Sequence, residues 1–298
     1  MEKSVIAKYK KAGEITQEVQ ELAKKRLKVG ANLFEFAEEI ESAIMKKGAK
    51  PAFPINLSIN NVAAHYSPAF NSKDTLPEDA VIKVDIGVHV DGYIADSART
   101  LDFSGKHQNM VKAAEDALEN AVAIAKKGAI IGDMGATIED AIRGAGFRPI
   151  QNLSGHGVAE FDAHTYPTIP NIANHDPKKL EDGIAIAIEP FATDGEGLVR
   201  EGSQAEIFQL EDKKPVRGRE ARKIIEFVEE NYRNLPFAER WLQRDLKMGE
   251  FGRKVGLREL MQKRCLTAFP LLKEEAGKIV TQAETTLILH DGKVTRLL

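Results

Sequence analysis

Several features that mark particular protein classes are scarce or missing in this chain. Its 298 residues include one cysteine, Cys265, which cannot form an intrachain disulfide. No apolar run approaches the roughly 18 residues of a membrane span. Residues 1–4 lead into a charged amphipathic stretch rather than a signal peptide. We therefore expect a cytoplasmic protein with no membrane partner.

The chain also lacks an excess of basic residues. Its 42 Lys and Arg stand against 45 Asp and Glu, a net charge of -3, whereas nucleic-acid-binding proteins usually carry a basic surplus. Local basic runs such as 213–223 are more often solvated faces or linkers than phosphate sites. We expect no specific nucleic-acid partner. The apolar fraction of 43% is ordinary for a globular protein that folds without disulfides or metals.

Apolar periodicity and turn residues predict mixed helices and strands. Asp91-Gly92 is a hairpin turn signal between two alternating stretches. Glycine-rich and proline-rich connections are expected around His156 and His164. The predicted helices cover 5–27, 32–48, 109–127 and 137–143, and the predicted strands cover 82–88, 93–101, 184–189, 205–210 and 278–289.

The composition changes from Asp212 onward. Residues 213–218 resemble a linker, and the following fifty residues have helical apolar spacing that ends at Phe269-Pro270. A β-rich body interrupted by a helical insert is the simplest interpretation. We expect the body to comprise 1–208 with 269–298 and the insert to comprise 209–268.

Asp85 and Asp96 are carboxylates embedded in the two strands of the predicted hairpin. A four-residue loop would pair them directly, whereas a two-residue loop would make them diagonal neighbours. Both registers place them on one face of the sheet. Adjacent negative charges repel unless a proton or cation lies between them, so the hairpin alone favours equally a metal site and a carboxylate that is protonated or paired with Arg99.

Glu189 and Glu284 are likewise embedded in apolar or uncharged strand patterns, and His156 is flanked by glycines. Flanking glycines let the backbone approach closely and leave an imidazole unobstructed. Taken singly, each of these residues, and His65 and His164 as well, is more often structural. The combination of four strand carboxylates with a glycine-flanked histidine is what favours a functional site.

The order Asp, Asp, His, Glu, Glu, with two Asp eleven residues apart on a hairpin, resembles the methionine aminopeptidase family over nearly the whole chain. The helical insert is similar to the type 2 subfamily in an archaeal-style form. The resemblance implies an α+β pita-bread fold, two pseudosymmetric halves enclosing metals, with a helical insert subdomain. The segments that carry it are Asn61–His65, Val84–Gly87, Gly92–Asp96, Ser154–Gly157, Ala187–Phe191 and Gln282–Glu284.

The resemblance also implies the roles of individual residues. Two divalent ions (Co, Mn, Fe or Zn) would be bound by Asp85, Asp96, His156, Glu189 and Glu284. Glu189 would also shuttle a proton, and His65 and His164 would hydrogen-bond the substrate amide and the tetrahedral oxygen. Phe53, Ala163 and Phe269 match positions that line the methionine pocket, although Phe269 replaces an expected tyrosine.

The implied activity is removal of the initiator methionine from nascent polypeptide N-termini when the next residue is small. We expect a monomer, and the resemblance leaves open a transient contact with the ribosome. Two alternatives share the fold. One is an X-Pro peptidase, although such relatives carry a sizeable domain ahead of the metal half. The other is a non-catalytic nucleic-acid-binding module, although those relatives have lost metal ligands that are all present here.

Overall fold

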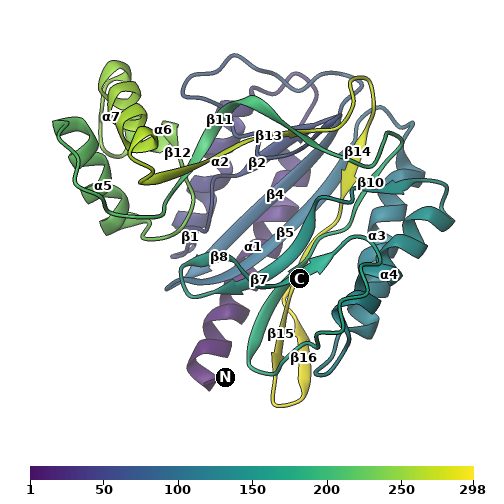
Figure 1. The fold of residues 1–298 in the computed structure, drawn as a ribbon. Helices are drawn as coiled ribbons and strands as arrows, with labels where there is room; N and C mark the ends of the chain where they lie inside the picture. The colour runs from purple at the N-terminus through teal and green to yellow at the C-terminus, as the bar shows by residue number, and fades with distance from the viewer.

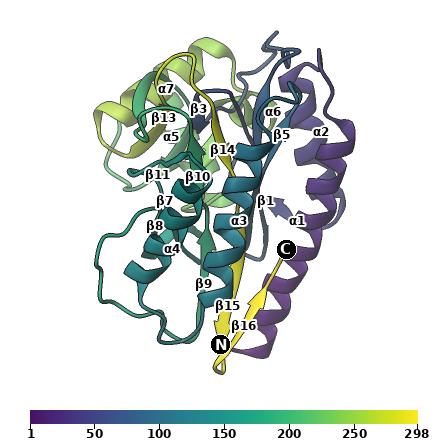
Figure 2. The same ribbon diagram turned by 90° about the vertical axis from the view of Figure 1, so that its right-hand side faces the viewer.

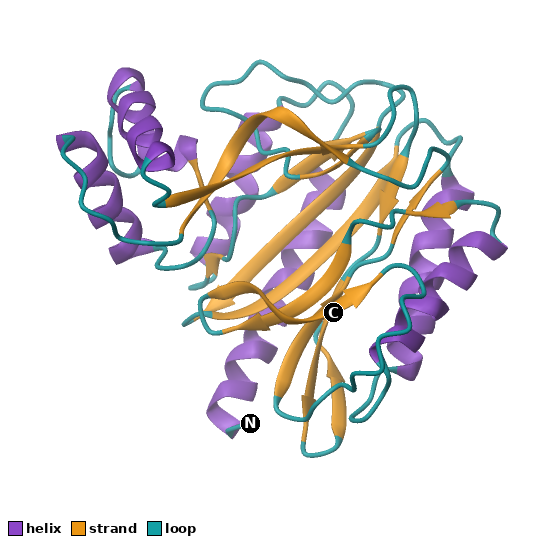
Figure 3. Ribbon diagram, in the orientation of Figure 1, coloured by secondary structure: helices purple, strands orange, loops and turns teal.

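The computed structural model describes residues 1–298 and has the mixed helices and strands of an α+β protein, which confirms that fold class. Helices lie at both sides of a curved body of antiparallel strands (Figures 1 and 3). The helices are α1 (Lys3–Arg26), α2 (Leu33–Lys46), α3 (Gln108–Ile124), α4 (Ile131–Gly144), α5 (Arg219–Asn231), α6 (Glu239–Arg244) and α7 (Glu250–Gln262). None of them combines the length and apolar character that crossing a membrane requires.

The strands form four hydrogen-bonded sheets, in the orders β1-β4-β2 with β5 on β4, β14-β10-β6, β12-β11-β13-β3 and β16-β15-β9-β7-β8. They are β1 (Lys50–Pro51), β2 (Asn56–Ile59), β3 (Val62–Ala64), β4 (Val81–Val90), β5 (Tyr93–Asp102), β6 (Arg148–Pro149), β7 (Ser154–Ala159), β8 (Asp162–Pro170), β9 (Ile184–Ile188), β10 (Phe191–Thr193), β11 (Arg200–Leu210), β12 (Phe237–Ala238), β13 (Leu266–Lys273), β14 (Val280–Gln282), β15 (Thr285–His290) and β16 (Lys293–Arg296).

The first half of the body is the β4–β5 hairpin covered by α1 and α2. Ile82, Val84, Ile86 and Val88 of β4 pack against these helices in one buried cluster. Because side chains alternate along a strand, Lys83, Asp85, Gly87 and His89 point to the opposite face. One face of β4 therefore packs against α1 and α2, and the opposite face points toward the space between the two halves of the body.

The second half repeats this arrangement with β9 and β15 covered by α3 and α4 (Figure 2). The halves meet through hydrogen bonds between β5 and the start of β15. The Asp96 N–H donates to Thr286 Oγ1 over 2.7 Å, and the Glu284 N–H donates to the carbonyl oxygen of Ala98 over 3.0 Å. The junction thus places Asp96 and Glu284 beside each other.

Helices α5, α6 and α7 gather at one end of the molecule (Figure 1) and share a buried cluster with β11, β12 and β13. Trp241, Phe237 and Leu260 lie at its centre. The chain leaves the body after β11 and returns through β13, which pairs with β11 from Arg200↔Lys273 to Leu210↔Leu266.

Most predicted helices and strands are confirmed, although several short strands were not predicted and the strand predicted over 278–289 divides into β14 and β15. Three further differences concern longer elements. The segments around His156 and His164, expected as connections, are the paired strands β7 and β8. Their glycines, prolines and charged residues mask the alternation that would indicate strands. Strand β13 was not predicted, since its apolar residues lack a clear period of two. Helix α4 begins at Ile131, six residues before the predicted start.

Candidate metal centre

The β4–β5 hairpin turns through the two residues Asp91 and Gly92, so Asp85 pairs with Ala98 and Asp96 pairs with Gly87. The two carboxylates are diagonal neighbours on the interior face, which selects the second of the two predicted registers. Arg99 points to the other face, where it forms an ion pair with Glu21 of α1. The salt-bridge alternative for the aspartate pair is therefore wrong.

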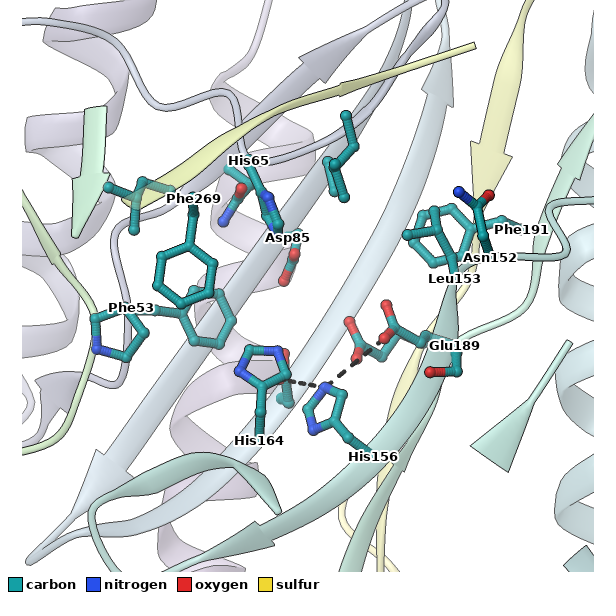
Figure 4. Close-up of a pocket in the computed structure, with 18 residues that line it drawn as sticks. Phe53, His65, Asp85, Asn152, Leu153, His156, His164, Glu189, Phe191 and Phe269 are labelled. Atoms are coloured by element: carbon teal, nitrogen blue, oxygen red, sulfur yellow. Dashed lines mark ion pairs between the residues drawn. The ribbon is translucent and has the colours of Figure 1, made fainter. Parts of the chain in front are cut away.

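The other predicted ligands converge on the same point (Figure 4). His156 of β7 lies with Nε2 3.8 Å from Asp96 Oδ2 and 3.7 Å from Glu189 Oε1. Glu189 follows β9, and Glu284 precedes β15. Ligand atoms of Asp96, His156 and Glu284 all lie within 4.8 Å of one another. Two side chains from the β4–β5 hairpin and three from β7 and the ends of β9 and β15 therefore surround one small volume.

The tautomer of His156 follows from its backbone contact. Nδ1 lies 3.1 Å from the carbonyl oxygen of Gly157, which can only accept, so Nδ1 carries the proton. Burial lowers the pKa of His156 to about 4, so the ring is neutral at pH 7. Its Nε2 lone pair then faces two carboxylates at distances too long for hydrogen bonds. Acceptors opposed in this way repel unless a proton or a cation lies between them.

The carboxyl groups are in an equally unfavourable setting without a cation. Burial raises the pKa of Asp96 to about 7. Burial, followed by the charges of Asp96 and Glu189, raises the pKa of Asp85 well above its usual range, and burial and Asp96 do the same for Glu189. Burial, Asp96, Glu189 and Asp85 together raise the pKa of Glu284.

Hydrogen bonding leaves part of this cluster unsatisfied, because Asp85 Oδ1 and Asp96 Oδ1 are buried without any partner. Buried polar atoms are normally satisfied, so these two oxygens are aimed at something that is not protein. Four carboxylates and one imidazole form an oxygen-rich donor set suited to first-row divalent ions. The residues present therefore fit divalent metal.

The glycines beside His156 have a steric role. A Cβ at Gly155 would lie 2.4 Å from the carbonyl oxygen of Ala187, and one at Gly157 would lie 2.3 Å from that of Tyr166. The strand that carries His156 thus lies unusually close to both neighbouring strands, β9 and β8. Only glycine permits this approach, which brings the imidazole to the carboxylates.

A cavity of about 270 Å³ opens from the carboxylates and His156. Figure 4 shows Phe53 and Phe269 at one end and Leu153 and Phe191 at the other. Phe53 lies close against β4, where a Cβ at Gly87 would come within 2.2 Å of its ring. The first end is thus apolar and aromatic, with the carboxylates between the two ends.

His65 and His164 lie where the aromatic end meets the carboxylates. The His164 ring is 4.2 Å from that of His156 and 6.5 Å from that of Phe269, and the His65 ring meets Phe269 edge-on at 5.5 Å. His65 adopts a positive φ of 69°, uncommon for a residue with a side chain. Its Nδ1 lies 3.1 Å from the carbonyl oxygen of Pro270, which directs Nε2 away from the strand.

Nine of the ten predicted site residues line this cavity, and Ala163 does not. Ala163 is buried in the core cluster that includes Phe53 and Val158, behind the cavity wall. Sequence analysis missed several lining residues, among them Asn56, Pro236, Ile207 and Leu272. Pro236 follows Leu235 in the run Asn234–Pro236, which reads as an ordinary turn, so no sequence signal would have identified it.

Comparisons with known proteins agree with this geometry. A model of metallopeptidase family M24 matches residues 7–214. A methionine aminopeptidase of Archaeoglobus fulgidus is 43% identical over 99% of each chain. Among solved structures, a thermophilic Arx1 superposes with a TM-score of 0.88 at 16% identity, covering 100% of this chain and 91% of the other.

A methionine aminopeptidase of Thermotoga maritima superposes with a TM-score of 0.70 at 20% identity, covering 100% of this chain and 97% of the other. At these identities the structural matches establish the fold alone, which is the pita-bread fold expected above. The ranking of the two structures does not bear on activity, because folds host unrelated functions.

Proposed function

The chain belongs to metallopeptidase family M24 and, within it, to the methionine aminopeptidases, and on that premise we propose that it removes the N-terminal methionine of nascent polypeptides. It is a metal-dependent hydrolase. The observation that carries the proposal is the convergence of Asp85, Asp96, His156, Glu189 and Glu284 on one volume beside an apolar cavity.

We propose that these five side chains hold two divalent ions, from among Co, Mn, Fe and Zn. Support comes from the two partnerless aspartate oxygens and from the raised pKa values of all four carboxyl groups. When bound, such ions supply Lewis acidity that lowers the pKa of a water molecule and polarises the scissile carbonyl.

Glu189 would move the proton in this reaction. Its Oε2 accepts a hydrogen bond from Gln282 Nε2 over 3.1 Å, which fixes the orientation of the carboxylate. Oε1 remains on the side of His156 and the cavity. A carboxylate oriented in this way can accept a proton from attacking water and deliver it to the leaving amine.

His65 and His164 would orient the substrate. Both rings line the cavity between the carboxylates and Phe269, so a ring N–H can reach a peptide carbonyl or amide there. Phe53 and Phe269 would receive the methionine side chain, since a thioether gains from contact with aromatic edges. Ala163 would support this wall from behind rather than contact the substrate.

The preference for a small second residue is proposed from the opposite end of the cavity. Leu153, Phe191 and Leu272 line that end. Their bulk limits the space for the side chain after methionine. Turnover of Met-Gly-Ser against Met-Leu-Ser and Ala-Pro-Gly tests the proposal with Mn²⁺ added to metal-stripped protein. Hydrolysis of Ala-Pro-Gly alone would favour the X-Pro alternative, and no hydrolysis would favour the binding module.

We also propose that residues 209–268 form an insert subdomain able to touch the ribosome transiently. These residues carry 15 Lys and Arg against 10 Asp and Glu, although the whole chain is acidic. A basic excess in this segment suits an enzyme whose substrates emerge beside ribosomal RNA. The same substrates place the protein in the cytoplasm, and we propose that it acts there as a monomer.

A further inference from the structure

A buried ionic cluster joins the insert to the first half of the body. Arg240 of α6 and Glu41 of α2 are 1% and 0% exposed, and the Arg240 Nη2–H donates to Glu41 Oε1. Glu41 Oε2 also accepts from Trp241 Nε1 over 2.7 Å and from Arg244 Nη1 over 3.1 Å. Arg240 Nε donates to Glu38 Oε1 over 3.2 Å. Both charged groups are thus fully hydrogen-bonded.

Such a cluster is weak evidence for stability, because desolvating two charges offsets much of their attraction. Apolar residues of similar volume would pack the same junction without that cost. The positions of the remaining hydrogen bonds give the cluster a more specific role.

Those hydrogen bonds lead to two segments that line the cavity. Arg240 Nη1 donates to Ser67 Oγ over 2.6 Å and to the carbonyl oxygen of Pro68 over 3.4 Å, two and three residues after His65. Ser67 Oγ in turn donates to the carbonyl oxygen of Ile55 over 2.9 Å, and the Ile55 N–H donates to Glu41 Oε1 over 3.3 Å. Ile55 lies between the lining residues Phe53 and Asn56.

A third wall element is attached to the same cluster through the chain. Pro236, which lines the cavity, precedes β12, and α6 with Arg240 follows β12 directly. Figure 1 shows α6 and β12 on the side of the insert that faces α2. The guanidinium therefore fixes the relative positions of segments 53–56, 65–68 and 236.

We propose that Arg240, held by Glu41, is a positioning residue that sets the shape of the aromatic end of the cavity and the placement of His65. By this arrangement the insert determines which N-terminal side chain is accepted. The proposal rests on the proposed function, because it assigns the specificity of that same site.

Arg240→Met tests this, with Arg253→Met as the matched control. Arg253 of α7 is also buried and donates to Glu239, Gln243 and the carbonyl oxygen of Met248, all within the insert and away from the cavity. We expect Arg240→Met to lower kcat/KM for Met-Gly-Ser about 10²-fold, the cost of a roughly 1 Å misplacement. The preference for Met-Gly-Ser over Leu-Gly-Ser should fall with it.

The Kd of Arg240→Met for Mn²⁺ should equal that of the wild type, since no metal ligand touches the ionic cluster. The control Arg253→Met should lose a similar amount of Tm but keep wild-type kinetics. Wild-type kinetics and specificity in folded Arg240→Met would overturn the proposal. If Arg240→Met does not fold, Ser67→Ala replaces it, because this change removes only the hydroxyl that bridges Arg240 and Ile55. Its preference for Met-Gly-Ser over Leu-Gly-Ser should fall in the same way. An unchanged ratio there also overturns the proposal.

Hydrogen exchange separates this result from a failure of the proposed function. The amides of Ile55 and Leu57 donate to Glu41 and to the carbonyl oxygen of Tyr66. They should exchange faster in Arg240→Met but not in Arg253→Met, whatever the wild-type enzyme cleaves. Equal exchange in the two variants contradicts positioning. A wild-type protein inactive on Met-Gly-Ser contradicts only the proposed function.

Discussion

Gln282 donates its side-chain N–H to Glu189 Oε2, while Glu189 Oε1 lies 3.7 Å from His156 Nε2. One oxygen of Glu189 is therefore anchored and the other faces the reaction volume. This division of roles is what a residue needs if it both holds metal and transfers a proton.

Glu189→Gln tests the proton transfer. Glutamine keeps the size and one coordinating oxygen, but it cannot accept a proton at neutral pH. At saturating Mn²⁺ we expect kcat for Met-Gly-Ser to fall about 10²–10⁴-fold, the usual range for losing a general base. Steady-state kinetics at several Mn²⁺ concentrations separate this loss from weaker metal binding. A kcat near wild type at saturating metal would show that Glu189 moves no proton.

Asp96→Asn tests the metal assignment. Asp96 contributes to the closest group of ligand atoms and appears among the causes of the raised pKa values of its three carboxylate neighbours. We expect this variant to bind Mn²⁺ at least 10-fold more weakly by calorimetry while remaining folded by circular dichroism, in line with the sensitivity of metal sites to their ligands and surrounding groups. Unchanged metal content after purification would refute the assignment.

The carboxyl groups of the metal centre should contribute less to the stability of the metal-free protein as pH rises. The four carboxyl groups have pKa values above their ordinary ones when folded, so the folded state binds more protons. The stabilisation that these carboxyl groups provide is fully present below about pH 4, which is their pKa in the unfolded chain. It is lost as pH rises through their pKa values in the folded protein, about 7 for Asp96. Chemical denaturation of chelator-treated protein between pH 4 and pH 8 measures this.

The Asp96→Asn variant is the control for that measurement. Between pH 4 and pH 8 its free energy of unfolding should fall less than that of the wild type. The difference between the two proteins should reach about 4 kcal/mol if the whole shift in the Asp96 pKa contributes. Mn²⁺ should restore wild-type stability at pH 8. A metal-free wild type whose stability changes with pH in the same way as that of Asp96→Asn would contradict the burial of the Asp96 charge.

Gly87→Ala probes the aromatic end of the cavity. The new methyl group would lie 2.2 Å from the Phe53 ring, so Phe53 must move. We expect KM for Met-Gly-Ser to rise about 10-fold, with Mn²⁺ affinity retained. Gly105→Ala serves as a control for stability, because nothing lies near that position although its φ is +68°. A KM unchanged by Gly87→Ala would exclude Phe53 from the methionine pocket.

Limited proteolysis tests the proposed insert boundary. Residues 211–217 lie outside helices and strands and are almost all exposed, and they include Lys213, Lys214 and Arg217. Trypsin should cut there first and leave a protected body, as judged by mass spectrometry. First cleavage after Lys83 of β4 would contradict the proposed organisation, since that side chain is fully buried in the body.

The hairpin and its carboxylates were predictable because their signals are local. A period of two fixes the shared face of Asp85 and Asp96, and Asp91-Gly92 marks the turn. The strand identity of His156 and His164 was not predictable by these means, because Gly155 and Gly157 are explained only by neighbouring backbones far along the chain. Resemblance to a family supplied the ligand roles that local pattern left undecided.

The cavity wall shows the same limit. Phe53 and Phe269 were named from the resemblance, whereas Pro236 and Asn56 reach the cavity only through tertiary packing of the insert and of β2. The cluster of Glu41 and Arg240 was equally hidden, because α2 and α6 are separated by nearly two hundred residues. Long-range charge pairing leaves no periodic trace in a sequence.

The pairing of Leu210 with Leu266 places the two ends of the insert side by side. Topologically, β11 and β13 are a hairpin whose loop has grown into a folded unit, and closing such a loop costs little more entropy as it lengthens. Evolution can therefore lengthen, shorten or exchange the outer part of this unit while the register of Ile207 opposite Phe269 stays fixed. The segment from Pro236 to Arg240 is the part whose position is constrained, because Pro236 lines the cavity and Arg240 is hydrogen-bonded to Ser67 and Glu41.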